Sequence, residues 1–305
     1  MMRHMVGWLV LVLVGAAAPA AAQKARKPQP APRPFEARLK FNAMFFDNFF
    51  QAAEGSPEEG VEAGGVEAHL ARKLKPKRPL EVFGHADYVA YRGFGPSAGV
   101  TAGLRSEGKP QGFELSAQYL KGRPSREVGD VLDRADALVL GGEYSYRITD
   151  DVQLSGLADY RKEHYDLSPL REYDAYNLGG AVRYRGFGRG FSPEVGLRWG
   201  KRDVLDDNED LSQRELFVRL RWTPMRDAYL TLRYRRRSRA YSTADVRASN
   251  LGREDTRTQW TLGADLRRGE RLTWSLYYAR EDSDSTRPSG VFQTQLVVLG
   301  LTLRL

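Results

Sequence analysis

The sequence predicts an all-β protein: a single antiparallel up-and-down β-barrel that spans a membrane. Three observations predict it: an export signal at the start, no cysteine, and about fourteen segments after residue 34 that alternate apolar and polar side chains. Leu272, Trp274, Leu276 and Tyr278 form the apolar half of one such segment. Successive side chains of a strand point to opposite faces, so each segment has one apolar and one polar face.

Residues 1–22 have the composition of a secretory signal peptide. Arg3 and His4 precede an apolar run from Met5 to Val14, and Ala20-Ala21-Ala22 offers a cleavage site. The run is shorter than the ~20 residues of a spanning helix, which disfavours the alternative of an uncleaved anchor. We expect export and cleavage near Ala22. The lack of cysteine excludes a lipid-anchored lipoprotein, disulfides and thiolate metal sites.

Residues 23–34 form a separate segment in which Pro alternates with Lys, Arg, Gln and Ala. Such a composition predicts an extended basic linker, placed in the periplasm between the signal and the barrel. The alternative is a basic tail that contacts an anionic envelope polymer or the mouth of a pore.

The barrel is predicted to occupy residues 35–305 as one domain. Strands are expected near residues 35–49, 61–73, 80–93, 98–107, 112–122, 135–148, 151–164, 173–186, 193–203, 213–223, 228–240, 256–267, 271–281 and 291–305.

The connections between these strands alternate in length. Tight turns are expected near 149–151, 188–192, 224–227 and 268–270, and longer polar loops near 50–60, 122–134, 165–172, 204–212, 241–255 and 282–290. Short periplasmic turns and longer outer loops are typical of outer-membrane barrels, and an even strand count puts both termini on the periplasmic side. Residues 95–97 break the pattern, because an outer loop expected there is very short.

The apolar face carries every tryptophan outside the signal peptide: Trp199, Trp222, Trp260 and Trp274. Aromatic girdles at the two membrane interfaces are typical of membrane barrels, so we expect this face to contact outer-membrane lipid. The alternative is the core of a soluble sandwich. It is disfavoured because one sheet of this many strands has to close or split.

The chain ends with Gly300-Leu301-Thr302-Leu303-Arg304-Leu305, in which Leu303 and Leu305 belong to the apolar face. The pattern of Gly, two residues, then hydrophobic-x-hydrophobic resembles the C-terminal signal of bacterial outer-membrane β-barrel proteins. The resemblance implies a porin-like barrel in the bacterial outer membrane, inserted by the barrel-assembly machinery through this last strand. It identifies a class and no family within it, and the chain ends in Leu where the class usually has an aromatic residue.

The polar face of the later strands is rich in arginine, while acids on that wall are few. We expect the following side chains to face the lumen and contact anions: Arg183, Arg185, Arg198, Arg219, Arg221, Arg233, Arg235, Arg237, Arg239 and Arg267. Acids of the earlier strands are predicted to form an opposing wall: Glu67, Glu81, Asp87, Glu114, Glu143 and Asp159.

A basic wall facing a more acidic one sets a transverse field, and its basic excess favours anions. Barrels of about eight strands are filled by side chains, and barrels of about sixteen to eighteen strands hold an aqueous channel. A barrel of about fourteen strands is intermediate, so we expect a narrow pore for small or oligomeric anionic solutes. The alternative is that the arginines only hydrate the lumen and pair with acids across strands. A second function stays open: the barrel component of a surface polysaccharide or lipoprotein export system with a separately encoded periplasmic partner.

Other chemistries are disfavoured. The formal net charge of +8 is typical of nucleic-acid binding, but export makes that partner unexpected. Gly95-Pro96-Ser97-Ala98-Gly99 matches the nucleophile-elbow string but lies between two strands, where that motif needs a strand followed by a helix. His69 and His85 are too few for a metal centre. We therefore expect no catalytic residues, no metal and no cofactor.

Overall fold

The computed structural model describes residues 35–47, 60–75, 78–108, 110–128, 131–188, 190–205, 210–242, 251–287 and 290–305. The predicted signal peptide and basic linker lie outside these residues. In the part of the chain that the structure describes, no helix is long and apolar enough to cross a membrane.

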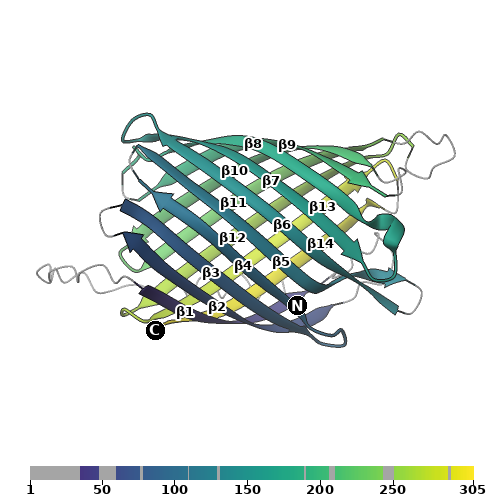
Figure 1. Ribbon diagram of the computed structural model, residues 1–305, viewed down its shortest axis with the longest axis horizontal. Helices are drawn as coiled ribbons and strands as arrows, with labels where there is room; N and C mark the ends of the chain where they lie inside the picture. Colours follow the sequence, from purple (N-terminus) through teal and green to yellow (C-terminus); the bar gives the residue numbers. More distant parts are fainter. Residues whose placement is uncertain are drawn as a thin grey trace, which may run out of the picture. The chain divides into compact units, whose positions relative to one another are not determined.

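The chain forms a closed antiparallel barrel of fourteen strands, and the predicted fold is confirmed. Figure 1 shows the tilted strands of the barrel from the side. Each strand pairs with its sequence neighbour, and all fourteen lie where the alternation predicts them. They are β1 (Phe35–Phe46), β2 (Val61–Lys75), β3 (Arg78–Tyr91), β4 (Ser97–Glu107), β5 (Gln111–Val128), β6 (Val131–Arg147), β7 (Val152–Tyr165), β8 (Tyr173–Tyr184), β9 (Ser192–Val204), β10 (Leu211–Met225), β11 (Ala228–Tyr241), β12 (Glu254–Arg268), β13 (Leu272–Ser285) and β14 (Phe292–Arg304).

The barrel closes where the first strand meets the last. β1 pairs with β14 from Arg38 opposite Arg304 to Phe46 opposite Leu296. Closure leaves no sheet edge, so the backbone N–H and C=O groups of every strand find partners within the barrel. A sheet can enter lipid only under this condition.

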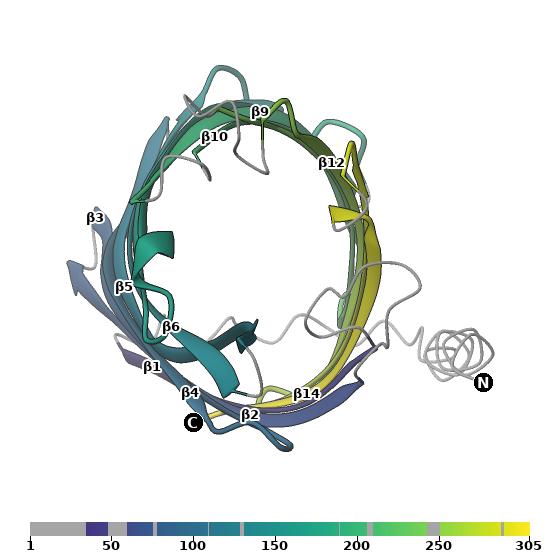
Figure 2. The ribbon, with the colours of Figure 1, turned by 90° about the vertical axis from the view of Figure 1, so that its right-hand side faces the viewer.

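One predicted loop is wrong. Residues 122–134 are not an outer loop, because β5 continues to Val128 and β6 begins at Val131. The two strands stay paired there, with register shifts near Leu120 and Pro124 that bend the hairpin. In Figure 2 the loop-side ends of β5 and β6 lie inside the outline of the ring, together with the short 3-10 helix η1 (Pro169–Arg171). Residues 122–134 are mostly polar on both faces, so the alternation did not reveal the ends of these two strands.

The short connection near residue 95 is real. β3 ends at Tyr91 and β4 begins at Ser97, and Gly93 takes a φ of +81° in the turn between them. A residue with a Cβ is strained at that angle, so glycine makes this tight reversal accessible.

The two faces of the wall differ as the alternation predicts. Trp199, Trp222, Trp260 and Trp274 are 52%, 45%, 47% and 50% exposed in the isolated chain, so they lie on the outer surface. Most residues of the other parity in the middle of the strands are half-buried or buried, as Phe217 is at 2% exposed. A closed barrel with a continuous apolar outer face flanked by aromatic residues is suited to lipid on every side.

Glycines on the lumen side of β8 and β9 let long side chains lie flat against the wall. A Cβ at Gly196 would come within 2.3 Å of the Phe217 ring and 2.8 Å of the Gly180 oxygen. A Cβ at Gly179 would come within 2.6 Å of the Arg198 side chain. The absence of a Cβ thus positions an aromatic ring and a guanidinium that face the lumen.

We predict that Gly196→Ala destabilises the barrel by about 1–3 kcal/mol, because the new methyl group overlaps Phe217 and the Gly180 carbonyl. Urea unfolding of the purified barrel measures the effect. Gly156→Ala is the matched control, since a Cβ there meets nothing within 4 Å. Equal stability of the two variants would contradict the packing argument.

Candidate functional site

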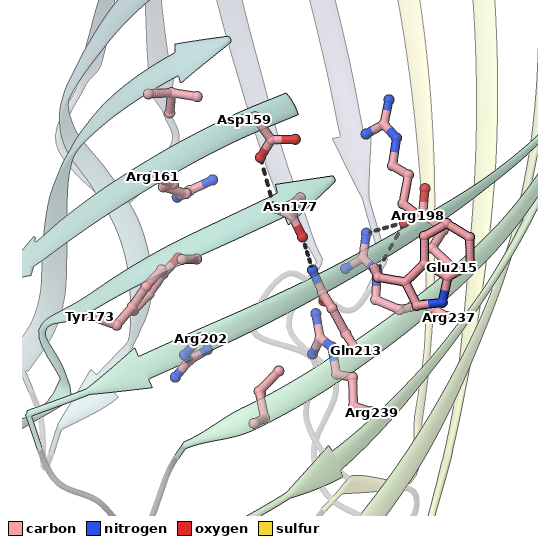
Figure 3. Close-up of a pocket in the computed structure, with 14 residues that line it drawn as sticks. Asp159, Arg161, Tyr173, Asn177, Arg198, Arg202, Gln213, Glu215, Arg237 and Arg239 are labelled. Atoms are coloured by element: carbon pink, nitrogen blue, oxygen red, sulfur yellow. Dashed lines mark hydrogen bonds and ion pairs between the residues drawn. The ribbon is translucent and has the colours of Figure 1, made fainter. Parts of the chain in front are cut away.

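The lumen wall formed by β7 to β11 encloses a cavity of about 300 Å³ (Figure 3). Its charged and polar lining comes from five adjacent strands, because each contributes side chains of the inward parity. These residues are Asp159, Arg161, Tyr173, Asn177, Arg198, Arg202, Gln213, Glu215, Arg237 and Arg239. We call this the arginine cavity.

Glu215 holds two of the predicted arginines. Its side chain is 6% exposed and accepts a hydrogen bond of 2.9 Å from Arg237 Nη2, and Arg235 Nη1 lies 3.8 Å away. β10 and β11 place Glu215 directly opposite Arg237, which fixes the pair by register. One carboxylate between two guanidiniums leaves the group with net positive charge.

Glu194 repeats this arrangement nearer the short turns. Its side chain accepts hydrogen bonds of 2.6 Å from Arg183 Nε and 3.0 Å from Arg219 Nη1. The side chain of Glu194 is 7% exposed, so this carboxylate is nearly desolvated. Charge-assisted hydrogen bonds of this kind stabilise buried ions and fix their geometry.

A chain of side-chain amides crosses the arginine cavity, as Figure 3 shows. Asn177 Nδ2 donates to Asp159 Oδ1 at 2.7 Å, and Gln213 Nε2 donates to Asn177 Oδ1 at 2.6 Å. A Cβ at Gly200 would overlap Asn177 Oδ1, so this glycine makes room for the chain. Asp159 therefore lies in the same cavity as the arginines, where the sequence placed it on an opposing wall.

Arg198, Arg233 and Arg239 belong to the arginines of the predicted set that have no carboxylate partner among the described residues. Their Nε atoms are buried without a hydrogen bond. The guanidiniums of Arg198 and Arg233 instead lie 5.5 Å and 5.9 Å from the centre of the Phe217 ring. An aromatic face attracts a cation without neutralising its charge, so these groups keep their capacity for an anion.

A second cavity of about 300 Å³ lies toward the short turns and mixes both charges. Arg183 and Arg185 share its lining with Glu114 and Glu143, and with Arg105 of β4. Arg185 follows the end of β8 and donates from Nη2 to Gln153 Oε1 at 2.6 Å. Glu114 and Glu143 are therefore neighbours of predicted basic residues and do not face them across the lumen.

The other predicted acids are paired within their own wall. Glu67 accepts a hydrogen bond of 3.1 Å from Lys40 Nζ and a second from Asn42, and Glu81 forms an ion pair with Arg105. Asp87 lies 3.8 Å from His85 Nε2. Glu67 and Glu81 are therefore each paired with a cation of an adjacent strand and not with one across the lumen.

The remaining predicted arginines lie toward the short turns. Arg221 of β10 is opposite Ser192 and Thr231, and Arg267 of β12 is opposite Thr273. Neither has an ion pair among the described residues.

Sequence reasoning missed several inward charged groups. Arg257 lies 3.5 Å from Glu281, and Glu163 accepts a hydrogen bond of 2.7 Å from Arg161 Nε. Asp255 is fully buried and accepts a hydrogen bond of 2.8 Å from Arg253. The parity of Arg267 and Asp265 on the same strand already implied that Asp255 and Arg257 face inward.

A third cavity, of about 430 Å³, is lined by residues from distant parts of the ring. Arg123 and Glu163, from β5 and β7, share it with Gln259 and Glu281, from β12 and β13. The bent end of the β5–β6 hairpin thus brings side chains toward the far wall and narrows the loop side of the lumen.

The structure gives the catalytic motifs no further support. Ser97 is buried at the first position of β4 and is preceded by a strand and a turn. The rings of His69 and His85 are 6.4 Å apart. Among the described residues, no group of three His, Asp or Glu side chains could hold a metal ion.

Solved structures with a similar fold are outer-membrane proteins. OmpT of Vibrio cholerae is 9% identical with a TM-score of 0.48, over 89% of this chain and 96% of that chain. OccAB3 of Acinetobacter baumannii is 9% identical with a TM-score of 0.49, over 89% and 99%. The outer membrane channel DcaP of Acinetobacter baumannii is 8% identical with a TM-score of 0.48, over 89% and 96%.

No protein-family model matches the chain, and no curated protein matches it. At these identities the likeness to solved structures concerns the fold alone. The closed fourteen-strand barrel with an apolar outer face is the architecture of bacterial outer-membrane β-barrel proteins.

We predict that Glu215→Gln lowers the stability of the barrel by about 1–3 kcal/mol, because Arg235 and Arg237 lose the carboxylate that they share. Urea unfolding measures the difference. Glu114→Gln is the control, since Glu114 is exposed and has no ion pair among the described residues. A Glu215→Gln barrel as stable as this control would show that the pair contributes nothing.

Proposed function

We propose that the protein is an outer-membrane pore whose narrow lumen favours anionic solutes. The observation that carries this proposal is a group of three lumen arginines, Arg198, Arg233 and Arg239, that have a buried Nε without a hydrogen bond and no carboxylate partner among the described residues. A cation held away from bulk water and left unpaired is costly, and a passing anion relieves that cost.

The composition of the arginine cavity supports the same preference. Five arginines and two carboxylates line it, so its formal charge is positive. One of the carboxylates, Glu215, is already shared by two guanidiniums, and the other, Asp159, is bound through Asn177. The field of the remaining cations therefore extends into the lumen.

The geometry favours carboxylates and phosphates over simple halides. A guanidinium presents a planar set of donors that matches two oxygens of one anion. The amides of Asn177 and Gln213 and the hydroxyl of Tyr173 add polar groups beside these cations. We expect hydroxylated anions, small or oligomeric, to exchange between these groups without binding tightly at any one of them.

We also propose that the outer face and the last strand direct the chain to its membrane. The outer face contacts lipid, and the last strand places Leu303 in the apolar face, opposite Leu39 of β1 and Leu272 of β13. Gly300 and Leu305 complete the terminal pattern, which the barrel-assembly machinery would recognise.

The selectivity proposal is tested in planar lipid bilayers. We expect the native protein to conduct, with a reversal potential in a salt gradient that indicates anion preference. Replacing Arg198 and Arg239 by Ser removes two unpaired cations of the arginine cavity. Anion preference should then fall severalfold or reverse toward cations.

The control replaces Arg72 and Arg268 by Ser, because both lie exposed on the outer face. Its reversal potential should equal that of the native protein. An unchanged selectivity in the Arg198→Ser, Arg239→Ser variant would overturn the anion proposal. A native barrel that never conducts would overturn the pore itself and favour the alternative, a barrel that works with a separately encoded periplasmic export partner.

The assembly role of the last strand makes a separate prediction. Leu303→Ser should slow insertion into outer-membrane extracts severalfold, because it places a hydroxyl on the apolar face at the terminal pattern. Thr302→Ser, one residue earlier on the lumen face, is the control. Folded and unfolded barrels are separated by their mobility on electrophoresis without heating, and equal rates for the two variants would contradict the prediction.

A further inference from the structure

The outer surface carries cations at the loop side of the barrel, in addition to its apolar and aromatic residues. Outward side chains on five of the strands from β7 to β13 are basic there. They are Lys162, Lys201, Arg214, Arg236 and Arg280, which we call the outer basic row.

Strand register places the central members of this row side by side. Lys201 is opposite Ser212, and Arg214 is the next outward residue along that strand. Arg214 is opposite Ser238, and Arg236 is the next outward residue along β11. Each step from strand to strand is therefore a diagonal, which follows the tilt of the strands and keeps the row at one level of the barrel.

An aromatic girdle lies immediately below the row. The outward residue two positions nearer the short turns is Trp199 below Lys201 and Tyr234 below Arg236. The ring of Tyr234 lies 4.6 Å from that of Trp260, centre to centre. Aromatic rings of this kind mark the boundary between hydrocarbon and headgroups, so the row lies at headgroup level.

The loop side is the outer side of the membrane. An even number of strands places both chain ends of the barrel with the short turns, which face the periplasm. At the turn side, aromatic residues of the outer face come close to the strand ends, as Trp222 does near Met225 and Trp274 near Leu272. At the loop side the strands continue past the girdle, so the row faces the outer leaflet.

Two members of the row that lie on adjacent strands, Arg214 and Arg236, are available for a ligand. Lys201 pairs with Asp203, and Arg280 pairs with Asp282 at 3.0 Å. Arg214 and Arg236 are exposed, and neither has an ion pair or hydrogen bond from its side chain among the described residues. Diagonal neighbours on adjacent strands are roughly 7–8 Å apart, so two arginine side chains can converge on one anion.

We propose that Arg214 and Arg236 bind the phosphate groups of a phosphorylated glycolipid in the outer leaflet. Guanidiniums at headgroup level match a phosphate in charge and in geometry. The girdle and the leucines beneath it, such as Leu232 below Tyr234, accept the acyl chains of the same molecule. The inference rests on the outer-membrane location but not on conduction through the lumen.

The test uses the purified full-length barrel in detergent with bisphosphorylated lipid A as the probe. Native mass spectrometry measures the fraction of protein that carries the lipid. The variant with Arg214→Ser and Arg236→Ser should bind at least about tenfold more weakly than the native protein, since each basic side chain at a membrane surface adds to the attraction. The control with Arg72→Ser and Arg268→Ser removes two outward charges at the other rim and should bind as the native protein does.

Dephosphorylated lipid A should bind the native protein as weakly as the intact lipid binds the variant. Equal binding of intact lipid A by variant and native protein would overturn the proposal, as would equal binding of phosphatidylglycerol and lipid A by the native protein. Electrophoresis without heating shows that each variant is folded. Bilayer conductance of the variant should be unchanged, so failure of the lipid proposal is distinguishable from failure of the proposed pore.

Discussion

Closure of the sheet between β1 and β14 is the constraint on which the rest of the structure depends. An open edge would expose unpaired backbone groups to lipid, at a cost of several kcal/mol each. Closure also fixes the parity of every strand, because a shift of one residue in any pairing would exchange its two faces. The lumen chemistry and the outer-face chemistry are therefore set together.

Parity explains how much could be predicted from the sequence. All fourteen strands, the outward tryptophans and the inward arginines followed from alternation alone. The end of the β5–β6 hairpin did not, because residues 122–134 are mostly polar on both faces and carry no alternation that separates a strand from a loop. Arg257 and Glu281 were within reach of the same rule, and only an incomplete application of it left them out.

The pairing of lumen charges could not be predicted, because alternation gives the face of a residue but not its neighbours across strands. The register places Glu215 opposite Arg237, and two arginines share that one carboxylate. It also places Asp159 in the arginine cavity, so the contrast between two walls is replaced by clusters of both charges on one wall. The positive charge that is left on the lumen wall comes from arginines without a carboxylate partner among the described residues, such as Arg198 and Arg239.

The glycines on the inner side of β8 and β9 have a consequence for the calibre of the channel. Because Phe217 and Arg198 rest over Gly196 and Gly179, their bulk occupies the thickness of the wall instead of the passage. The free width of the lumen at this level is thus controlled by residues that have no side chain. A single methyl group there would lift a ring or a guanidinium toward the axis, so permeability can be tuned without altering any charged residue.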